Sequence, residues 1–466
     1  MIGGGLAGLS AAVALAEAGL RVKLLERRPF LGGRASSYTL PGGEHVDNCQ
    51  HVTLGCCTNL ADFYGRIGAA DLIKFYDQLI FVDRQGRRTT MQASGLPAPL
   101  HLGPSLALYS SLSVSDKRLI GLAMIAIARR GGRNEDGDAA GVSMLEWLRR
   151  NGQTLEAIER FWSVVLVSAL NEELGRTDAR YGLDVFWKAF LSNRNGYRIG
   201  IPSVPLGQLY GGCRGAIERR GGEVVLRAAV RGLRIAEGQV AAIQMADGRE
   251  ESTDLYVVAV PHDVLPGLLP AAIIDGEPSF GNLRRLGVSP ITGVHFWFDR
   301  EVIAEPFLTL VDRTTQWIFN KSRLNAENVS ASAGGQYLQL VISASYGLLP
   351  RSRQDIIALC LDELREVLPE SHAAKLLKAT VIKETAATFS PEPGCDRWRP
   401  PQRTPLANLF LAGDWTATGW PATMEGAVRS GYMAAEALLA AEGTPRRFLQ
   451  PDLPVEGFAR LFAADR

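Results

Sequence analysis

The residues with the clearest chemical meaning in this sequence are the glycines of its first turn. Gly3, Gly5 and Gly8 occupy the fixed places of the pattern G-x-G-x-x-G. The first glycine permits a tight turn, the second lets backbone approach a pyrophosphate, and the third lets a helix pack closely on a sheet. Leu6 and Ala7 lead into an alanine-rich helix, whose free N–H groups and positive dipole end would face the phosphates. The turn therefore predicts a pyrophosphate site.

A carboxylate and a second pair of glycines follow this turn. Glu26 ends a strand-like run, near the spacing of about 20 residues at which an acid binds a ribose hydroxyl. It favours an unphosphorylated adenosine ribose, as in FAD or NAD. Gly32 and Gly33 allow another close backbone approach, and Arg34 offers a forked donor to a diphosphate. We place these residues, together with Arg27, in one predicted cofactor site.

The second strong motif lies near the other end of the chain. An apolar strand, residues 408–412, leads into a turn, and a glycine-containing loop then starts an alanine-rich helix. Asp414 in the turn can accept a hydrogen bond from a ribityl hydroxyl, and the start of the helix can stabilise negative charge on the N1–C2=O edge of a flavin. One FAD would bridge the two glycine-rich ends of the chain. The predicted binding residues here are Gly413, Asp414, Thr423, Met424, Glu425 and Ala427.

The elements around these motifs predict an α/β fold with two long insertions. Helices of the first insertion carry many large apolar groups and few ionisable ones, which suits a pocket for a long apolar substrate and would equally suit a plain helical core. The second insertion contains strand-like runs that could form a sheet over such a pocket. We predict a discontinuous Rossmann-like FAD-binding domain (residues 1–80, 203–264 and 386–445), an inserted α+β substrate-binding domain (residues 81–202 and 265–385) and a C-terminal tail (residues 446–466).

The first strand of the predicted nucleotide-binding sheet is unusually short. Only Met1 and Ile2 precede Gly3, whereas a strand usually has about 5–6 residues. We therefore expect the natural chain to carry a few more apolar residues before Met1, and a chain extended in this way to bind FAD more tightly.

Composition places the chain among globular proteins and narrows its partners. Of its 466 residues 46% are hydrophobic and 21% charged, and the net charge is +1. This balance gives no electrostatic reason to expect nucleic acid as a partner. The six cysteines form no C-x-x-C pair and no metal-ligand spacing, so we predict no metal site and a reducing, cytoplasmic location. The sequence leaves the oligomeric state open.

One apolar run bears on the question of a membrane partner. Residues 119–128 are apolar and end in Arg129 and Arg130, but a bilayer span needs about 20 residues. The run can be a buried helix of a cap domain. Alternatively, it faces the membrane or the substrate channel with its arginines at lipid headgroups, which would place the protein peripherally on the inner face of the membrane.

The order of these motifs resembles a known family. A glutamate followed by Gly-Gly-Arg, after G-x-G-x-x-G, resembles the FAD-dependent amine oxidase and phytoene desaturase superfamily over nearly the full length. The resemblance implies an FAD cofactor, with the second glycine segment and its arginine over the pyrophosphate. It also implies that Val230 contacts the adenine. A valine that only packs in the protein core would give the same sequence pattern. Residues 47–51 would pass close to the flavin, with Cys49 where the family often has glycine.

Local strings favour one branch of this family. Residues 47–51, 96–102 and 413–427 are similar to the bacterial squalene-associated branch known as hydroxysqualene dehydroxylase. This implies reduction of hydroxysqualene to squalene in hopanoid synthesis, with a hydride from flavin N5 reaching an allylic carbon as the hydroxyl leaves as water. Loss of the hydroxyl needs a proton donor, and the sequence places none securely. The candidate catalytic residues are His51, His101 and His295.

Three other functions remain open. A phytoene-type carotenoid desaturase is the nearest rival, because both reactions exchange a hydride at N5; either enzyme would take a long apolar isoprenoid. An amine oxidase is a more distant alternative, because prolines and helices rather than an aromatic cage dominate the insertions. A non-catalytic prenyl-lipid escort protein would share the fold, but it would not need the FAD contacts of Glu26, Arg34 and Asp414.

Overall fold

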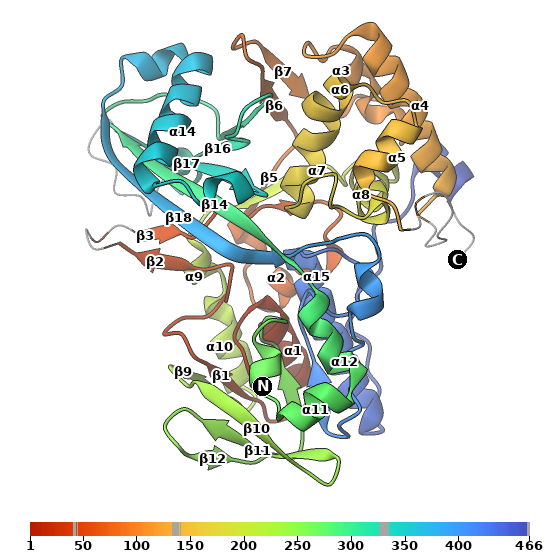
Figure 1. Ribbon diagram of the computed structural model, residues 1–466, viewed down its shortest axis with the longest axis vertical. Coiled ribbons are helices and arrows are strands. Elements are labelled where there is room, and N and C mark those ends of the chain that lie inside the picture. The colour runs from red at the N-terminus through yellow and green to blue at the C-terminus, as the bar shows by residue number, and fades with distance from the viewer. Residues whose placement is uncertain (41–42, 44, 133–138, 140, 326–334, 464–466) are drawn as a thin grey trace.

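The computed structural model describes residues 1–466 except 41–42, 44, 133–138, 140, 326–334 and 464–466. The chain forms two stacked parts (Figure 1). A parallel sheet with its helices makes the lower part of that view, and a larger, mostly antiparallel sheet with further helices makes the upper part. The predicted α/β fold class is confirmed.

Short parallel strands form the sheet of the lower part. β1 pairs with β9, and β13 pairs with β19. Ile2 bridges Leu25 on β1 and Val258 on β13, so the start of the chain joins the two pairs. β13 and β19 are buried along their whole length, as expected for parallel strands covered on both faces. The bounds are β1 Lys23–Glu26, β9 Glu223–Leu226, β13 Tyr256–Val258 and β19 Leu409–Leu411.

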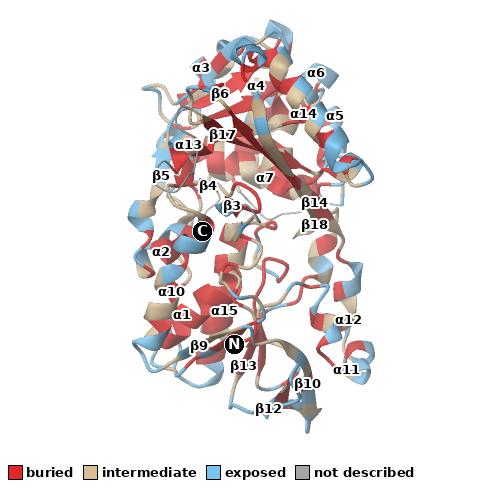
Figure 2. Ribbon diagram, turned by 90° about the vertical axis from the view of Figure 1, so that its left-hand side faces the viewer, coloured by how far each residue is buried: buried red, intermediate tan, exposed pale blue. Residues whose placement is uncertain are grey.

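Two helices, α1 (Leu6–Glu17) and α15 (Met424–Ala441), pack on this sheet and against each other. A Cβ atom on Gly431 of α15 would lie 2.1 Å from Ser10 Oγ and 2.4 Å from Ala7 O, so the helices cross too closely for any larger residue. Figure 2 shows α1 and α15 as largely buried, which agrees with the apolar, alanine-rich composition of α1.

Smaller elements surround the lower sheet. An antiparallel sheet of three strands lies at its far end, and short helices cover the sides (Figure 1). The bounds are β10 Val230–Ala236, β11 Gln239–Met245, β12 Glu250–Glu251, α2 Thr58–Arg66, α9 Leu206–Leu209, α10 Gly211–Glu218, α11 Ala271–Gly276 and α12 Pro278–Gly281.

The upper sheet has seven strands in the order β18-β14-β17-β16-β15-β6-β7. Because successive side chains point to opposite faces, Ile318 and Leu340 pack toward α14, whereas Phe319 and Val341 join the core shared with the other helices. The bounds are β6 Leu79–Val82, β7 Arg88–Met91, β14 Val288–Phe298, β15 Phe307–Leu310, β16 Trp317–Asn320, β17 Gln336–Ser343, β18 Leu376–Phe389 and α14 Arg353–Val367.

Two long strands connect the two parts. β14 and β18 are antiparallel neighbours and run together from the upper sheet toward the lower part (Figure 1). β18 continues across the domain boundary that we predicted between residues 385 and 386.

Helices cover the face of the upper sheet that lies opposite α14. The longest, α4, starts after Ser113, whose hydroxyl accepts a hydrogen bond from the Asp116 backbone amide at 3.1 Å, and ends at Gly131 in the left-handed conformation. Among the described residues, no helix has the length and apolar character needed to cross a membrane. The bounds are α3 Gly103–Ala107, α4 Val114–Arg130, α5 Met144–Arg150, α6 Leu155–Ala157, α7 Ser163–Leu170, α8 Ala179–Val185 and a π-helical continuation of α8 at Phe186–Leu191.

A buried ion pair joins β3 to the upper part. Lys321 Nζ lies 2.9 Å from Asp47 Oδ2 and donates to Gln50 Oε1 at 2.8 Å, and both charged side chains are almost fully buried. Burial raises the pKa of Asp47, but Lys321 and hydrogen bonds from Ser37 and the Leu206 amide outweigh it and hold the pKa below its usual value. The remaining elements are β2 Ser37–Thr39, β3 His45–Asp47, β4 Thr53–Leu54, β5 Ile73–Tyr76, β8 Ile199–Pro202 and α13 Lys321–Leu324.

Candidate active site

The two N-terminal glycine segments touch through their backbones. The Gly32 amide donates to the carbonyl of Gly4 at 2.8 Å, and a Cβ atom on Gly33 would lie 2.8 Å from Gly5 Cα. Gly33 has a φ of +62° and Gly3 a φ of +105°, and both values favour glycine. Gly5 precedes α1 and supplies no side chain to cap the helix. The first turn of α1 is therefore free to bind a group outside the chain.

Glu26 stands at the end of β1 beside these segments. Its carboxylate accepts a hydrogen bond from the Gly4 amide and one from the Arg28 amide, each at 2.7 Å. These bonds fix the carboxylate at the mouth of the first glycine turn. A carboxylate has about four lone-pair sites, so two remain for the hydroxyls of a ribose.

Arg34 and Asp414 join the two ends of the chain. Arg34 Nη2 lies 2.6 Å from Asp414 Oδ1, and Arg34 Nη1 donates to the carbonyl of Ala387 on β18 at 2.9 Å. The Asp414 side chain is almost fully buried and that of Arg34 is about one-third exposed. The ion pair thus holds the second glycine segment, the turn after β19 and the strand β18 in one arrangement.

The start of α15 faces the same region. Thr423 caps the helix by accepting a hydrogen bond from the Gly426 amide at 3.0 Å. The Glu425 carboxylate is engaged elsewhere: it accepts from the Leu60 amide at 2.7 Å and the Asn59 amide at 3.2 Å in the first turn of α2. Arg429 pairs with it at 2.8 Å. Glu425 therefore fixes α2 to α15, and only the start of its helix is left to act on a flavin.

One cavity of about 500 Å³ joins all these segments. Of the predicted cofactor residues, only Gly8 does not line it; a Cβ atom there would lie 2.0 Å from Gly3 O, so Gly8 serves close packing. The lining residues among those predicted are Gly3, Gly5, Leu6, Ala7, Glu26, Arg27, Gly32, Gly33, Arg34, Val230, Gly413, Asp414, Thr423, Met424, Glu425 and Ala427.

The cavity continues into an apolar chamber in the upper part. Its walls come from α7 and the π-helical segment on one side and from the seven-stranded sheet on the other. The chamber is lined largely by aliphatic and aromatic side chains, which suits a long apolar substrate. Those side chains include Leu79, Phe81, Val164, Val165, Phe190, Ile291, Trp317, Phe319 and Val341.

His51 is the predicted histidine that lines the cavity. Its Nδ1 donates to the carbonyl of Cys49 at 2.9 Å, which leaves Nε2 without a proton in the neutral ring. Burial lowers the pKa of His51, and the nearby charges of Arg34 and Lys321 lower it further, whereas the Cys49 carbonyl and Asp47 oppose them. His51 is thus a neutral ring whose only ring proton is already donated, and it is a poor proton donor.

The structure does not bring the other two predicted histidines, His101 and His295, to the cavity. Neither lines the cavity, and both are completely buried. Burial lowers the pKa of His101 to about 4 and that of His295 to about 3. His295 Nδ1 forms a hydrogen bond with the Tyr337 hydroxyl at 2.7 Å, and His101 packs near the ring of Tyr197. Both are core residues, because tertiary packing decides whether a histidine reaches a site.

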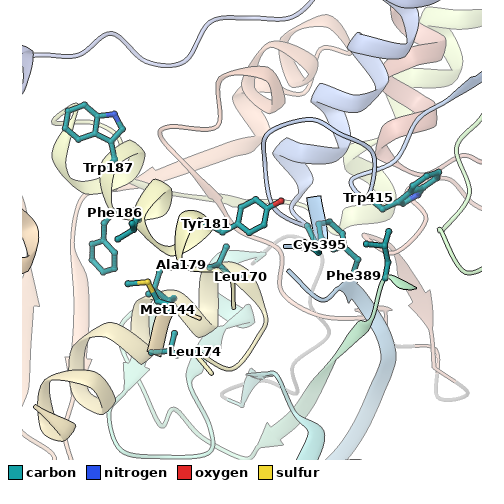
Figure 3. Close-up of a cluster of buried hydrophobic side chains, with 14 of the residues drawn as sticks. Met144, Leu170, Leu174, Ala179, Tyr181, Phe186, Trp187, Phe389, Cys395 and Trp415 are labelled. Carbon is teal, nitrogen blue, oxygen red and sulfur yellow. The ribbon is translucent and has the colours of Figure 1, made fainter. Parts of the chain in front are cut away.

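Arg399 organises the loop between Asp414 and α15, and no sequence motif points to it. Its guanidinium is buried and donates to the carbonyls of Asp414 at 2.9 Å, Thr416 at 2.6 Å and Trp420 at 2.8 Å. It also donates to the hydroxyl of Tyr181 on α8. Figure 3 shows Tyr181 directed away from Phe186 and toward Cys395 and Trp415. One side chain therefore fixes the shape of the flavin-facing loop against the helical layer.

Asp184 is the second residue that sequence reasoning missed. It lies on α8, lines the cavity and is only partly exposed. Burial raises the pKa of Asp184 to about 6, although Lys188 and Arg130 oppose the shift.

Among the described residues, no group of three or more His, Cys, Asp or Glu side chains is arranged to hold a metal ion.

The donor set fits a dinucleotide flavin. The glycine segments carry no side chains that would block a pyrophosphate, and the uncapped start of α1 favours an anion. Glu26 and Asp414 can accept hydrogen bonds from hydroxyls at two separate places. An apolar chamber adjoins the start of α15. Fold and site together define an FAD-dependent oxidoreductase.

Comparison with known proteins identifies the family. The family model for flavin containing amine oxidoreductase matches residues 6–439, and the chain belongs to this family. The 15-cis-phytoene desaturase of Synechococcus elongatus is 28% identical over 96% of this chain and 96% of its own length. The tomato (Solanum lycopersicum) 15-cis-phytoene desaturase is 28% identical over 94% of this chain and 76% of its own length. The zeta-carotene desaturase of Synechocystis sp. is 26% identical over 94% and 96%.

Solved structures share the fold. An oxidoreductase from Methanosarcina mazei superposes with a TM-score of 0.72 at 18% identity, covering 92% of this chain and 97% of that one. A putrescine oxidase bound to putrescine gives a TM-score of 0.70 at 16% identity, covering 94% and 98%.

Proposed function

We propose that this enzyme carries out two-electron chemistry on a long polyisoprenoid. The observation that carries the proposal is the single cavity that joins the nucleotide-binding loops to an apolar chamber. FAD supplies a two-electron acceptor or donor at its N5 position. The chain's own contribution is to bind the pyrophosphate at the glycine segments, to orient the ring at the start of α15, and to exclude water from the chamber.

Carotenoid-type desaturation has the support of the relatives. The named desaturases of phytoene and zeta-carotene match this chain almost end to end. In such a reaction one carbon loses a hydride and its neighbour loses a proton. The walls formed by Phe319, Val341 and Phe190 would hold an extended hydrocarbon by contact alone, because such a substrate offers no polar group.

Reductive dehydroxylation of hydroxysqualene is the second candidate function. It is favoured by the resemblance of residues 47–51, 96–102 and 413–427 to that branch. Asp184 adds a specific observation, because loss of a hydroxyl needs an acid and this carboxyl lies in the cavity with a pKa raised to about 6 by burial.

Two anaerobic assays on the purified, FAD-loaded enzyme test the proposal. In one, phytoene and a quinone acceptor are supplied, and desaturated product is measured by its absorbance. In the other, hydroxysqualene and chemically reduced FAD are supplied, and squalene is measured by gas chromatography. Desaturation supports the first candidate and squalene the second. If the enzyme converts neither substrate but oxidises a primary amine, the polyisoprenoid proposal is refuted.

We also propose that the enzyme docks on the inner, cytoplasmic face of a membrane. The outer face of α4 presents Arg118, Leu122, Ile125 and Arg129, which follow one another at helical spacing and are all exposed. Two apolar side chains between two arginines are typical of a helix at a lipid surface. Further exposed apolar side chains nearby are Leu96, Leu100, Leu108, Val114, Phe458 and Leu461.

Vesicle flotation tests this docking face. The wild-type protein should float with vesicles of phosphatidylcholine and phosphatidylglycerol. The double variant Leu122→Asp/Ile125→Asp should bind at least tenfold more weakly, since each buried aliphatic side chain contributes about 1.5–3 kcal/mol. The matched control is Leu377→Asp, which changes an equally exposed leucine on β18. Equal flotation of the double variant and the control would rule out this face.

A further inference from the structure

One face of the helix that runs from α8 into the π-helical segment forms a wall of the cavity. Tyr181, Asp184, Val185, Lys188 and Ala189 all line it. Their spacing of three, four, seven and eight residues places them on one side of the helix. Asp184 therefore points into the cavity because of its position on the helix.

The other polar groups of this helix are paired. Lys188 Nζ lies 2.8 Å from Asp452 Oδ2 in the C-terminal segment, and the Tyr181 hydroxyl bonds to Asp396 and Arg399. No hydrogen bond or ion pair joins the Asp184 carboxylate to any residue that the structure describes. The Asp184 side chain is partly exposed and lines the cavity, so its carboxyl is accessible to a group that enters from outside the chain.

The helix that carries Asp184 contacts the loop that leads into α15. The Lys188 ammonium, one helical turn further along the same face, is 5.4 Å from the ring centroid of Trp420. Trp420 precedes Thr423, the cap of α15, and both line the cavity. The cavity wall that carries Asp184 is thus, one helical turn further along, in contact with the loop that leads to the flavin-binding end.

The surrounding charges leave Asp184 able to change its protonation state near neutral pH. Burial raises its pKa to about 6; Lys188 on the same helix, Arg130 at the end of α4 and Arg180 act in the opposite direction, and Asp452 adds to the rise. An apolar substrate would remove further water and raise the pKa more. A group that titrates near the working pH is suited to give or take a proton.

The other ionisable groups in the cavity are poorer candidates. His51 is neutral, and its only ring proton is donated to Cys49. Glu384 on β18 interacts with Arg28 and Arg34, which places it with the nucleotide-binding segments. Lys188 is held by Asp452.

We propose that Asp184 is the catalytic residue that exchanges a proton with the substrate, an inference that rests on the proposed polyisoprenoid chemistry. In dehydroxylation the carboxylic acid gives its proton to the hydroxyl oxygen and the C–O bond breaks. Water leaves, and the carbon receives a hydrogen with both bonding electrons from a two-electron reductant of the reduced-flavin class. In desaturation one carbon gives a hydride to a two-electron acceptor of the oxidised-flavin class, the carboxylate takes a proton from the neighbouring carbon, and the electrons of that second C–H bond form the new double bond.

The pH dependence of turnover separates these roles. As an acid, Asp184 must be protonated, so the rate should fall as pH rises through its pKa. As a base it must be ionised, so the rate should rise over the same range. Asp184→Asn should lower turnover about 10²–10⁴-fold and remove this pH limb in either case. Asp184→Glu should keep part of the rate together with the pH limb.

Two measurements keep the test independent of folding and of turnover. Flavin absorbance should show the same FAD content in wild type and variants. Infrared difference spectra of the wild type should show a carboxylic acid C=O band that titrates near the kinetic pKa and is absent from Asp184→Asn. The matched control is Glu159→Gln, an exposed carboxyl that lies outside the cavity.

Each outcome has one meaning. If Asp184→Asn turns substrate over at the wild-type rate, or if the infrared band persists in this variant, the role of Asp184 is overturned and the proposed function is not. A wild type that converts neither isoprenoid overturns the proposed function, and the role of Asp184 fails with it. Loss of turnover, pH limb and band together, with FAD content unchanged, supports the role.

Discussion

Replacing Lys321 by methionine should destabilise the protein in a pH-dependent way. The substitution leaves the Asp47 carboxylate buried with two remaining donors, the Ser37 hydroxyl at 2.6 Å and the Leu206 amide at 3.1 Å. It also removes the donor at 2.8 Å from Gln50 Oε1. Removing one partner of a buried ion pair costs about 3–5 kcal/mol. With an unfolding entropy of about 2.1 cal/mol/K per residue, this corresponds to a fall in Tm of about 3–5 °C for a chain of this length.

The sign of the pH effect follows from the pKa of Asp47. In the wild type its pKa is depressed, so its contribution to stability is present above the unfolded value of about 3.9 and is lost as pH falls through the folded value. In Lys321→Met, the lysine charge no longer opposes the effect of burial on the Asp47 carboxyl. The pKa of Asp47 in the folded protein should therefore rise above its value in the unfolded chain. The difference in Tm between variant and wild type should then be greatest at pH 7 and should shrink toward pH 4.

Thermal unfolding followed by circular dichroism between pH 4 and 8 measures this difference. The double variant Lys321→Met/Asp47→Asn removes the stranded charge, so it should recover more than half of the lost stability at pH 7 and show little pH dependence. A single variant whose loss is the same at pH 4 and pH 7 would refute the reasoning, because the penalty would then come from packing and not from a buried charge.

Two further substitutions test the cofactor site. Gly33→Ala should weaken FAD binding at least tenfold in a fluorescence titration, because the new Cβ would lie 2.8 Å from Gly5 Cα; the control Gly68→Ala has a φ of +72° but no atom within 4 Å, so it should bind FAD normally. Arg399→Lys should lower the free energy of unfolding by about 1–3 kcal/mol in urea titrations, because fewer donors remain for the loop carbonyls, whereas the exposed Arg397→Lys should not. Normal binding by the first variant, or equal stability of the last two, would contradict these roles.

The glycine segments could be predicted because their role is local. The shape of the Gly3–Gly8 turn and its amide donors depend only on residues that are adjacent in the sequence, so the spacing of the glycines is enough to locate it. Glu26 and Asp414 are almost as local, since each ends or follows an apolar strand at the edge of the parallel sheet.

The remaining site residues depend on contacts between distant parts of the chain. Glu425 belongs to the predicted motif, yet its carboxylate binds the first turn of α2. It accepts a hydrogen bond there from the amide of Asn59, which lies 366 residues earlier in the chain. Arg399 and Asp184 belong to no motif, and only the packed loop and helix give them their roles. His101 shows the reverse case, because a reactive residue type was buried in the core.

The strands β14 and β18 make the spacing between the two halves of the cavity a property of the folded chain. Arg34, next to the nucleotide-binding glycines, donates to Ala387 near one end of β18, while the other end of β18 lies in the upper sheet. Backbone pairing joins β14 and β18 over most of their length, with register shifts at Ser289/Ile291 and Trp297/Phe298. This pairing holds the nucleotide-binding segments at a set distance from the apolar chamber before any substrate binds. For the polyisoprenoid proposed above, the reacting carbon would then be selected by how far the substrate enters the chamber before its end meets the wall.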